Sequence, residues 1–205
     1  MPDTAQAGVQ DRDVELSVVA PAYNEAECIE AFVDRTDRAV RELGLSYELL
    51  LVDDGSTDAT FQIALGLTHR IDGLRIVRLS RNFGHELAST AGLAVSRGRA
   101  VVLMDADLQD PPELIGRLVE KWREGYHVVY AQRRSRRSDG WIRRSCGFLM
   151  YRLIRSGTRL NLPRDTGDYR LMDRVVVDAF SRMPERHRFV RGMVAWLGYR
   201  QTGVP

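Results

Sequence analysis

Short apolar runs alternate with amphipathic stretches along the first two thirds of the chain. Runs of this length, bounded by polar or proline-containing turns, predict buried strands. They lie at residues 16–20, 47–52, 74–79, 100–104 and 126–131.

Between these strands, apolar residues recur at helical spacing. Within 27–43 the residues Ile29, Phe32, Val33, Val40 and Leu43 fall on one face of a helix. Further helices are predicted from about residue 58, over 86–96 and over 111–122. Strand–helix alternation with short connections predicts an α/β fold, in which helices cover both faces of a mostly parallel sheet.

The pattern changes after residue 131. An arginine-rich stretch leads to a predicted amphipathic helix over 141–155, and a turn-rich stretch follows at 161–168. A short segment at 169–172 and two helices, at about 174–182 and 188–197, complete the chain. Residues 1–13 are polar and aperiodic, which predicts a flexible tail before a single domain over 14–205.

Polar residues gather directly after four of the predicted strands. They occupy residues 22–25, 53–56, 80–85 and 105–110. In a parallel sheet the carboxyl ends of the strands meet at one edge, where ligands bind. The sequence therefore predicts a ligand site built from these four loops.

The composition is that of an ordinary globular domain. Of 205 residues, 44% are hydrophobic and 28% charged, which excludes collagen-like, disordered and disulfide-scaffold classes. Cys28 and Cys146 form no CxxC pair, so no zinc site is indicated. No run approaches the ~18 apolar residues of a membrane span. The N-terminus lacks the apolar core of a signal peptide, which makes the cytosol the default location.

The net charge of +2 hides a local excess of arginine. Residues 133–155 contain eight arginines and one acidic residue, Asp139. This excess predicts an anionic partner such as phosphate, a membrane surface or nucleic acid, with a solvated helix face as the alternative. Nucleic acid is disfavoured because few aromatic residues accompany the arginines.

The loop after the fourth strand carries the clearest candidate chemistry. Asp105 and Asp107 could converge on one divalent cation, and Gln109 could add a further oxygen ligand. The alternative is a solvated turn with helix-capping aspartates.

The other loops suit a nucleoside. The ring of Tyr23 could stack on a base, Glu25 could bind ribose hydroxyls, and Asp53 could bind a base or a ribose. Capping turns would use the same residue types. There is no GxGxxG, Walker or GxSxG motif, which disfavours dinucleotide oxidoreductases, P-loop kinases and serine hydrolases. Of the four histidines, only His85 is placed in the predicted site.

Five motifs together resemble one family. They are AYNE at 22–25, VDDGSTD at 52–58, SRNFGH at 80–85, DADLQDPPE at 105–113 and DTGDYRLMDR at 165–174. In this order they resemble the polyprenyl-phosphate glycosyltransferases of family 2, of the dolichol-phosphate mannosyltransferase and GtrB type. The resemblance covers 14–205 and implies a GT-A fold. It also implies inverting transfer of a hexose from a nucleotide sugar, of the UDP-glucose or GDP-mannose class, to a polyprenyl phosphate.

The same resemblance implies roles for individual residues. It places Pro21, Tyr23, Glu25, Asp53 and Asp105 at the donor nucleotide. The remaining assignments are Asp105, Asp107 and Gln109 to Mg²⁺ or Mn²⁺, Asp107 and Asp168 to catalysis, and Arg133 and Arg144 to the acceptor phosphate. Gly147 stands where many relatives have a serine, so one donor to that phosphate is missing.

Members of the family continue into a membrane segment that this sequence lacks. We therefore expect a truncated chain whose native form lies at the cytoplasmic side of a membrane. Two alternatives remain open. One is a GT-A enzyme with a soluble sugar or glycan acceptor. The other is a non-enzymatic protein that binds anionic membrane or nucleic acid through the arginines of 133–155. The sequence specifies neither the sugar nor the oligomeric state.

Overall fold

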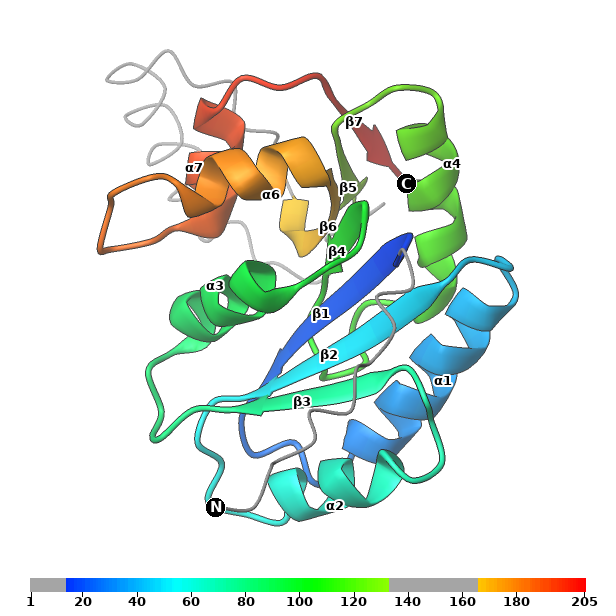
Figure 1. The fold of residues 1–205 in the computed structure, drawn as a ribbon, viewed down its shortest axis with the longest axis vertical. Coiled ribbons are helices and arrows are strands. Elements are labelled where there is room, and N and C mark those ends of the chain that lie inside the picture. Colours follow the sequence, from blue (N-terminus) through cyan, green and yellow to red (C-terminus); the bar gives the residue numbers. More distant parts are fainter. Residues whose placement is uncertain (1–13, 133–165) are drawn as a thin grey trace, which may run out of the picture.

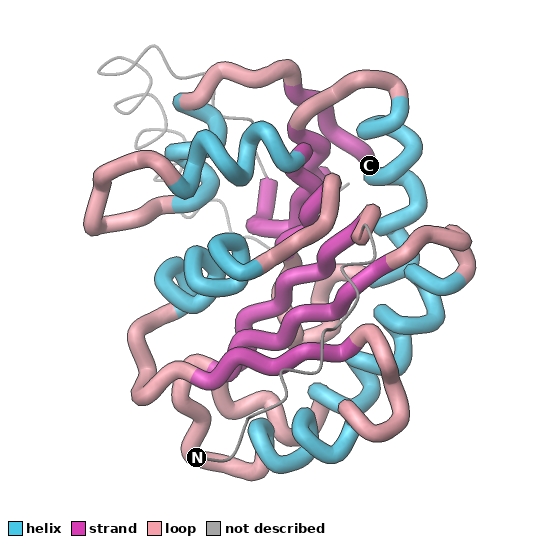
Figure 2. The backbone as a smooth tube through the Cα atoms, viewed as in Figure 1, coloured by secondary structure: helices cyan, strands magenta, loops and turns pink. Residues whose placement is uncertain are grey.

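A central sheet covered by helices on both faces organises the protein (Figures 1 and 2). The computed structural model describes residues 14–132 and 166–205. Within them the sheet has seven strands in the order β3-β2-β1-β4-β6-β5-β7. The strands are β1 (Leu16–Ala22), β2 (Tyr47–Asp53), β3 (Leu74–Arg78), β4 (Ala100–Leu103), β5 (Val128–Gln132), β6 (Thr166–Asp173) and β7 (Gln201–Val204).

The helices are divided between the two faces. The chain forms α1 (Ile29–Arg41), α2 (Thr60–Leu67), α3 (His85–Val95), η1 (Pro112–Leu114), α4 (Ile115–Arg123), α6 (Arg174–Ser181) and α7 (Val190–Trp196). One face carries α1, α2 and α4, and the other carries α3, α6 and α7 (Figure 1). The predicted α/β class is confirmed.

The direction of the strands also agrees with the sequence. β1 is parallel to β2 and β4, β2 is parallel to β3, and β5 is parallel to β7. Only β6 runs antiparallel, between β4 and β5. Among the described residues the sheet is therefore mostly parallel, as predicted.

Burial on both faces explains the continuous apolar runs. In β1, Val18 and Ala20 pack on the α1 side, whereas Val19 packs on the α3 side, and all three are fully buried. A strand that is covered on both faces needs apolar residues at every position rather than at alternate ones. The predicted face of α1 is confirmed for four of its five apolar residues, which are fully buried; the fifth, Leu43, follows the end of the helix and packs partly buried against the same core.

Three details differ from the sequence prediction. β1 continues through Pro21 to Ala22, because pairing with β4 ends at Val19 and the proline ring does not interrupt that ladder. The segment at 169–172 is part of the longer strand β6, and the end of the chain forms the unpredicted strand β7. The predicted tail at 1–13 and the predicted helix at 141–155 lie outside the described residues. The single domain over 14–205 stays a prediction.

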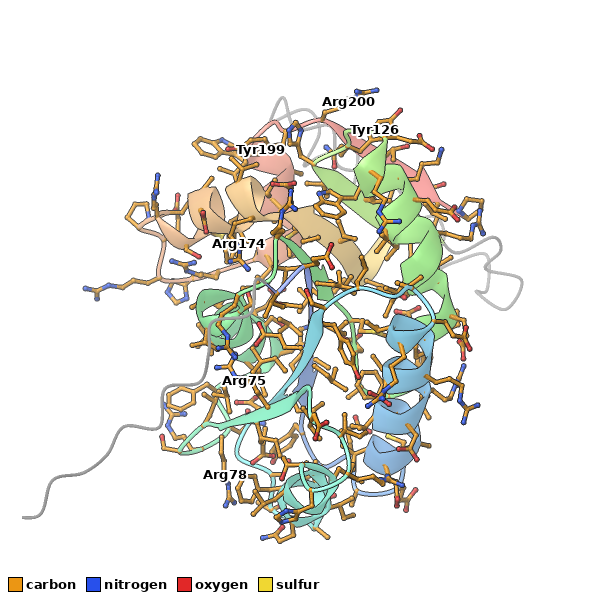
Figure 3. The ribbon with its side chains drawn as sticks, turned by 45° about the vertical axis from the view of Figure 1, so that its right-hand side comes forward. Arg75, Arg78, Tyr126, Arg174, Tyr199 and Arg200 are labelled. Atoms are coloured by element: carbon orange, nitrogen blue, oxygen red, sulfur yellow. The ribbon has the colours of Figure 1, made fainter. Side chains whose placement is uncertain are left out.

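A buried carboxylate ties together the edge of the sheet where β2 begins. Glu48 is 2% exposed, and its Oε1 accepts hydrogen bonds from the Ser17 hydroxyl and the Arg97 amide, each at 2.7 Å. Arg75, which extends from β3 (Figure 3), pairs with its Oε2. Burial alone would raise the pKa of Glu48, but these donors outweigh burial and lower it.

We expect Glu48→Gln to destabilise the protein at pH 7 by about 1–3 kcal/mol, because it removes charge-assisted bonds from a buried site. The folded pKa lies below the unfolded value. This contribution is therefore present above the unfolded pKa of about 4.3 and is lost as pH falls through the folded pKa. Urea unfolding of both proteins across that range should give free energies that converge in acid. Glu30→Gln, at an exposed ion pair with Arg70, is the control and should change little. A difference that is independent of pH would contradict this account.

Candidate active site

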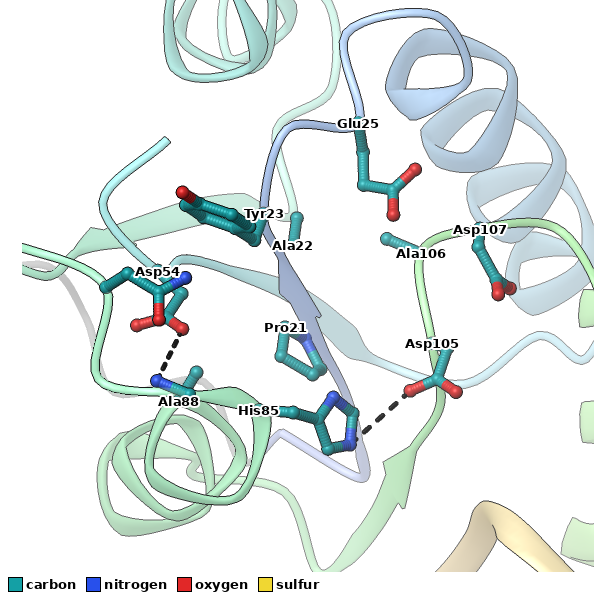
Figure 4. Close-up of a pocket in the computed structure, with 12 residues that line it drawn as sticks. Pro21, Ala22, Tyr23, Glu25, Asp54, His85, Ala88, Asp105, Ala106 and Asp107 are labelled. Atoms are coloured by element: carbon teal, nitrogen blue, oxygen red, sulfur yellow. Dashed lines mark hydrogen bonds and ion pairs between the residues drawn. The ribbon is translucent and has the colours of Figure 1, made fainter. Parts of the chain in front are cut away.

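A pocket of about 320 Å³ opens where β1 and β4 end. Along the chain, β2 and β3 extend the sheet on one side of β1, whereas β4 lies on its other side. The pocket therefore sits at the point where the strand order reverses, the usual ligand site of such sheets. Six predicted site residues line it (Figure 4), namely Pro21, Tyr23, Glu25, His85, Asp105 and Asp107.

Hydrogen bonds join the loop after β1 to the loop after β2. The amide of Asn24 donates to the Ser56 hydroxyl at 3.0 Å, and the amide of Glu25 donates to the Thr60 hydroxyl at 2.8 Å. Asn24 adopts a φ of 56°, and its side-chain oxygen accepts from the Thr57 amide at 2.9 Å. An asparagine tolerates this backbone better than most residues. These bonds fix Tyr23, which is 42% exposed, and Glu25 at the rim of the pocket.

The two adjacent aspartates at the end of β2 lie in different surroundings. Asp53 is 2% exposed and does not belong to the pocket lining; its Oδ1 accepts from the Ser56 amide at 3.2 Å. Arg78 Nε lies 3.2 Å from its Oδ2, without the geometry of a hydrogen bond. Contact between Asp53 and a nucleoside stays a prediction.

Asp54 does line the pocket, and sequence reasoning gave it no role. Its two carboxylate oxygens accept hydrogen bonds from the amides of Phe83 and Gly84, both at 2.8 Å. Gly55 has a φ of +69°, and a Cβ there would lie 2.4 Å from the backbone carbon of Arg81. The second aspartate and the glycine thus fasten the loop before α3 to the pocket. In the sequence, the signal for this role was the second of two consecutive aspartates directly before a glycine.

The loop after β4 brings Asp105 and Asp107 to the opposite wall. Asp107 accepts a hydrogen bond from the Gln109 amide at 2.9 Å, and the Gln109 side chain is exposed. Leu108 between them adopts a φ of 60°, an uncommon backbone for a bulky residue that tends to mark functional loops. Neither Gln109 nor Asp168 belongs to the pocket lining.

Asp168, at the start of β6, lies between two basic side chains. Arg170 is 4% exposed and donates from Nε and Nη2 to the carbonyls of Asp168 and Gly167. Its Nη2 also lies 3.7 Å from Asp168 Oδ1. On the other side, Nε2 of His85 lies 3.6 Å from Asp168 Oδ2 and 3.6 Å from Asp105 Oδ1. Antiparallel β6 therefore brings Asp168 beside the acidic loop after β4.

The electrostatics of this acidic cluster suit a cation. Burial raises the pKa of Asp105; the nearby His85 opposes that shift, and the carboxylates of Asp168 and Asp107 add to it. Asp105 Oδ1 and Asp168 Oδ1 are both buried without a hydrogen-bond partner. Unpaired carboxylate oxygens are the hard ligands that Mg²⁺ and Mn²⁺ prefer. Within the described ranges, however, no three acidic, histidine or cysteine side chains are grouped to hold a metal by themselves.

The Cys28 thiol supports the pocket from behind Glu25. It donates to Glu25 Oε2 at 3.0 Å and lies 3.5 Å from the carbonyl of Ala106. Burial and the adjacent Glu25 raise the pKa of this thiol to about 12, so it stays protonated at neutral pH. Arg133 and Arg144, the predicted acceptor-phosphate residues, lie outside the described residues.

Comparison with solved structures identifies the fold. A mannosyltransferase from Pyrobaculum calidifontis, solved with GDP-mannose and Mn²⁺, matches with a TM-score of 0.66 at 22% identity. The match covers 95% of this chain and 56% of that one. The arrangement of strands and helices is therefore the GT-A fold, as predicted.

Sequence comparison then gives the family. The model of "Glycosyl transferase family 2" matches residues 17–180, so the chain belongs to glycosyl transferase family 2 and is a transferase. A glycosyltransferase of Synechocystis is 47% identical over 93% of this chain and 60% of its own length. The bactoprenol glucosyl transferase of Shigella phage SfX is 40% identical over 93% of this chain and 62% of its own length. The predicted resemblance to polyprenyl-phosphate glycosyltransferases is confirmed.

The match leaves part of each relative uncovered. The chain spans about 60% of the length of these two curated relatives. In the parts of the chain that the structure describes, none of the helices is both long and apolar enough to cross a membrane.

Proposed function

We propose that this protein transfers glucose from UDP-glucose to a polyprenyl phosphate of the bactoprenol type, with inversion at the anomeric carbon. The observation that carries the proposal is the strand-end pocket with Tyr23, Glu25, Asp105 and Asp107 on its walls, in a chain 40% identical to a bactoprenol glucosyl transferase. A polyprenyl acceptor lies in a membrane, so the enzyme works at a membrane surface.

The donor nucleotide would occupy the part of the pocket beside β1 and β2. The ring of Tyr23 is available to stack on the base, and the carboxylate of Glu25 can accept hydrogen bonds from ribose hydroxyls. The Cys28 thiol holds the Glu25 carboxylate toward the loop after β4. Asp53 would support this wall through Ser56 and Arg78.

The diphosphate would lie beside Asp105 and Asp107. A bound Mg²⁺ or Mn²⁺ would stabilise the charge that develops on the leaving nucleoside diphosphate. Asp105 and Asp107 would hold it, with Gln109 nearby and phosphate and water oxygens as further ligands. The buried, unpaired Oδ1 of Asp105 supports its part in that assignment.

The acceptor phosphate would approach from the side of Asp168. One of its oxygens forms the new bond to the anomeric carbon while the bond from that carbon to the diphosphate oxygen breaks. A phosphate monoester with a second pKa near 6 is largely a dianion at pH 7, so orientation matters more than deprotonation. Asp168 would accept the proton of the monoanionic fraction, and Arg133 and Arg144 would bind the phosphate.

A transfer assay tests this function. Membranes that contain the expressed protein are incubated with radiolabelled UDP-glucose or GDP-mannose, Mn²⁺ and either undecaprenyl phosphate or soluble glucosides. We expect label to enter the lipid fraction from UDP-glucose only, and only when the lipid phosphate is present. Label transferred to a soluble glucoside would favour the alternative acceptor class, and no transfer from any donor would contradict the proposal.

A further inference from the structure

We propose that His85 is a positioning residue that holds the carboxylate of Asp168 beside the donor wall of the pocket. The inference rests on the proposed function and extends it, because it assigns a role to a residue between the donor-side and acceptor-side carboxylates. It starts from the placement of the imidazole, whose Nε2 lies 3.6 Å from Asp105 Oδ1 and 3.6 Å from Asp168 Oδ2 (Figure 4 shows the first contact).

Hydrogen bonds from the preceding residues hold the backbone at His85 in place. His85 is the first residue of α3 and follows Gly84, whose φ is +94°. The buried carboxylate of Asp54 receives the amides of Phe83 and Gly84. Any movement of this loop away from the sheet would therefore break two charge-assisted hydrogen bonds.

Helix α3 is equally constrained. A Cβ at Gly92 would lie 2.4 Å from Val19 Cγ1, so the helix packs directly on β1. In its first turn, Glu86 accepts a hydrogen bond from the amide of Val190 at the start of α7. These contacts hold His85 beside the end of β4 and the start of β6.

The side chain itself keeps freedom to adjust. It is 41% exposed, and 3.6 Å is longer than a hydrogen bond, so the contacts of Nε2 with the two carboxylates are electrostatic. Active-site contacts of this kind commonly tighten when substrate binds. The Nε2 group can then donate to Asp168 Oδ2 and fix the orientation of the carboxylate.

Asp168 needs such a partner because Arg170 supports it from one side only. Arg170 is buried beneath the start of β6 and binds the carbonyls of Gly167 and Asp168. It therefore fixes the backbone, and its Nη2 lies 3.7 Å from the buried Oδ1 of Asp168, whereas Oδ2 faces His85. His85 lines the pocket, and its Nε2 lies 3.6 Å from Asp168 Oδ2.

The test compares His85→Ala, His85→Gln and the exposed-site control His69→Ala in the transfer assay. Residue 69 lies in the turn after α2, away from the pocket. We expect His85→Ala to lower kcat by about 10- to 100-fold, the usual effect of removing a partner from a functional carboxylate, with KM for UDP-glucose and affinity for UDP within about twofold of wild type. His85→Gln keeps an N–H near Nε2 and should recover part of the rate. Unchanged melting temperatures would separate this role from a structural one.

Several outcomes would overturn the inference. If His85→Ala kept the wild-type turnover, the inference would be wrong and the proposed function would stand. If the variant raised the donor KM at constant kcat, His85 would be assigned to donor binding instead, and the proposed function would again stand. If the wild-type protein itself showed no transfer, the proposed function would be wrong instead. A crystal structure of His85→Ala gives a readout that is independent of activity. We expect the Asp168 carboxylate to leave its place beside Asp105, and an unmoved carboxylate would refute the positioning role.

Discussion

Replacement of Asp168 by asparagine should reduce hexose transfer by about 10- to 100-fold, the usual cost of losing a polar partner beside a metal site, since most of the acceptor phosphate is already a dianion and needs no base. The amide has the same shape as the carboxylate but cannot accept a proton, and it does not balance the charge of Arg170 at 3.7 Å. Binding of UDP should persist, because Asp168 is not part of the pocket lining. Initial rates with saturating donor, together with calorimetry of UDP, measure both effects.

The matched control is Asp178→Asn. Asp178 lies on α6, half exposed, 3.8 Å from Arg174. The Asp178→Asn variant should transfer glucose at the wild-type rate. If Asp168→Asn kept that rate as well, Asp168 would have no part in the reaction. If it lost UDP binding and thermal stability together, the effect would come from the buried Arg170 rather than from chemistry.

The second large effect concerns the metal. In Asp107→Ala we expect the affinity for UDP in the presence of Mn²⁺ to fall at least about 100-fold. Substitution of a residue that merely supports a metal ligand already lowers metal affinity or activity about 10- to 100-fold. Asp107 lines the pocket and its carboxylate is anchored by the Gln109 amide, so it is aimed before a cation arrives. Titrations of UDP into the protein, one in the presence of Mn²⁺ and one in the presence of EDTA, measure the two affinities.

The control for this experiment is Asp72→Ala, in the exposed connection between α2 and β3. It should bind UDP as the wild type does and keep its response to EDTA. Asp107→Ala should bind equally weakly with and without Mn²⁺. A folded Asp107→Ala variant that still bound UDP more tightly with Mn²⁺ would assign the cation to other residues.

Local pattern predicted the parallel part of the sheet because each of its units is complete over a short stretch of chain. Every strand from β1 to β5 is a short, largely apolar run, and a helix follows each of the first four, with clear periodicity in α1 and α4. β7 is different, because three of its four residues are only partly buried and its pairing partner is β5, far back in the sequence. A strand specified mainly by its neighbour leaves little local signal.

The same reasoning explains which parts of the site were foreseen. Tyr23, Glu25, Asp105 and Asp107 follow parallel strands, so the topology alone brings them together. The contact of His85 with Asp168 depends on β6 being inserted antiparallel beside β4, a choice that no local pattern indicates. Asp54 was overlooked because its partners are backbone amides, which carry no mark in a sequence.

The pairing of β5 with β6 has a consequence for how such enzymes diversify. The chain leaves the sheet at Gln132 and re-enters it at Thr166, and these two residues are register partners on adjacent strands. Residues 133–165 are thus bounded by two residues that are paired in the sheet, and the described strands on either side pair with one another without them. Under the proposed function, exchange of the gene segment for this stretch alone would replace the predicted acceptor-phosphate arginines and leave the residues that line the donor pocket unchanged. Changes in the proposed lipid acceptor and in the proposed nucleotide sugar would then be inherited separately.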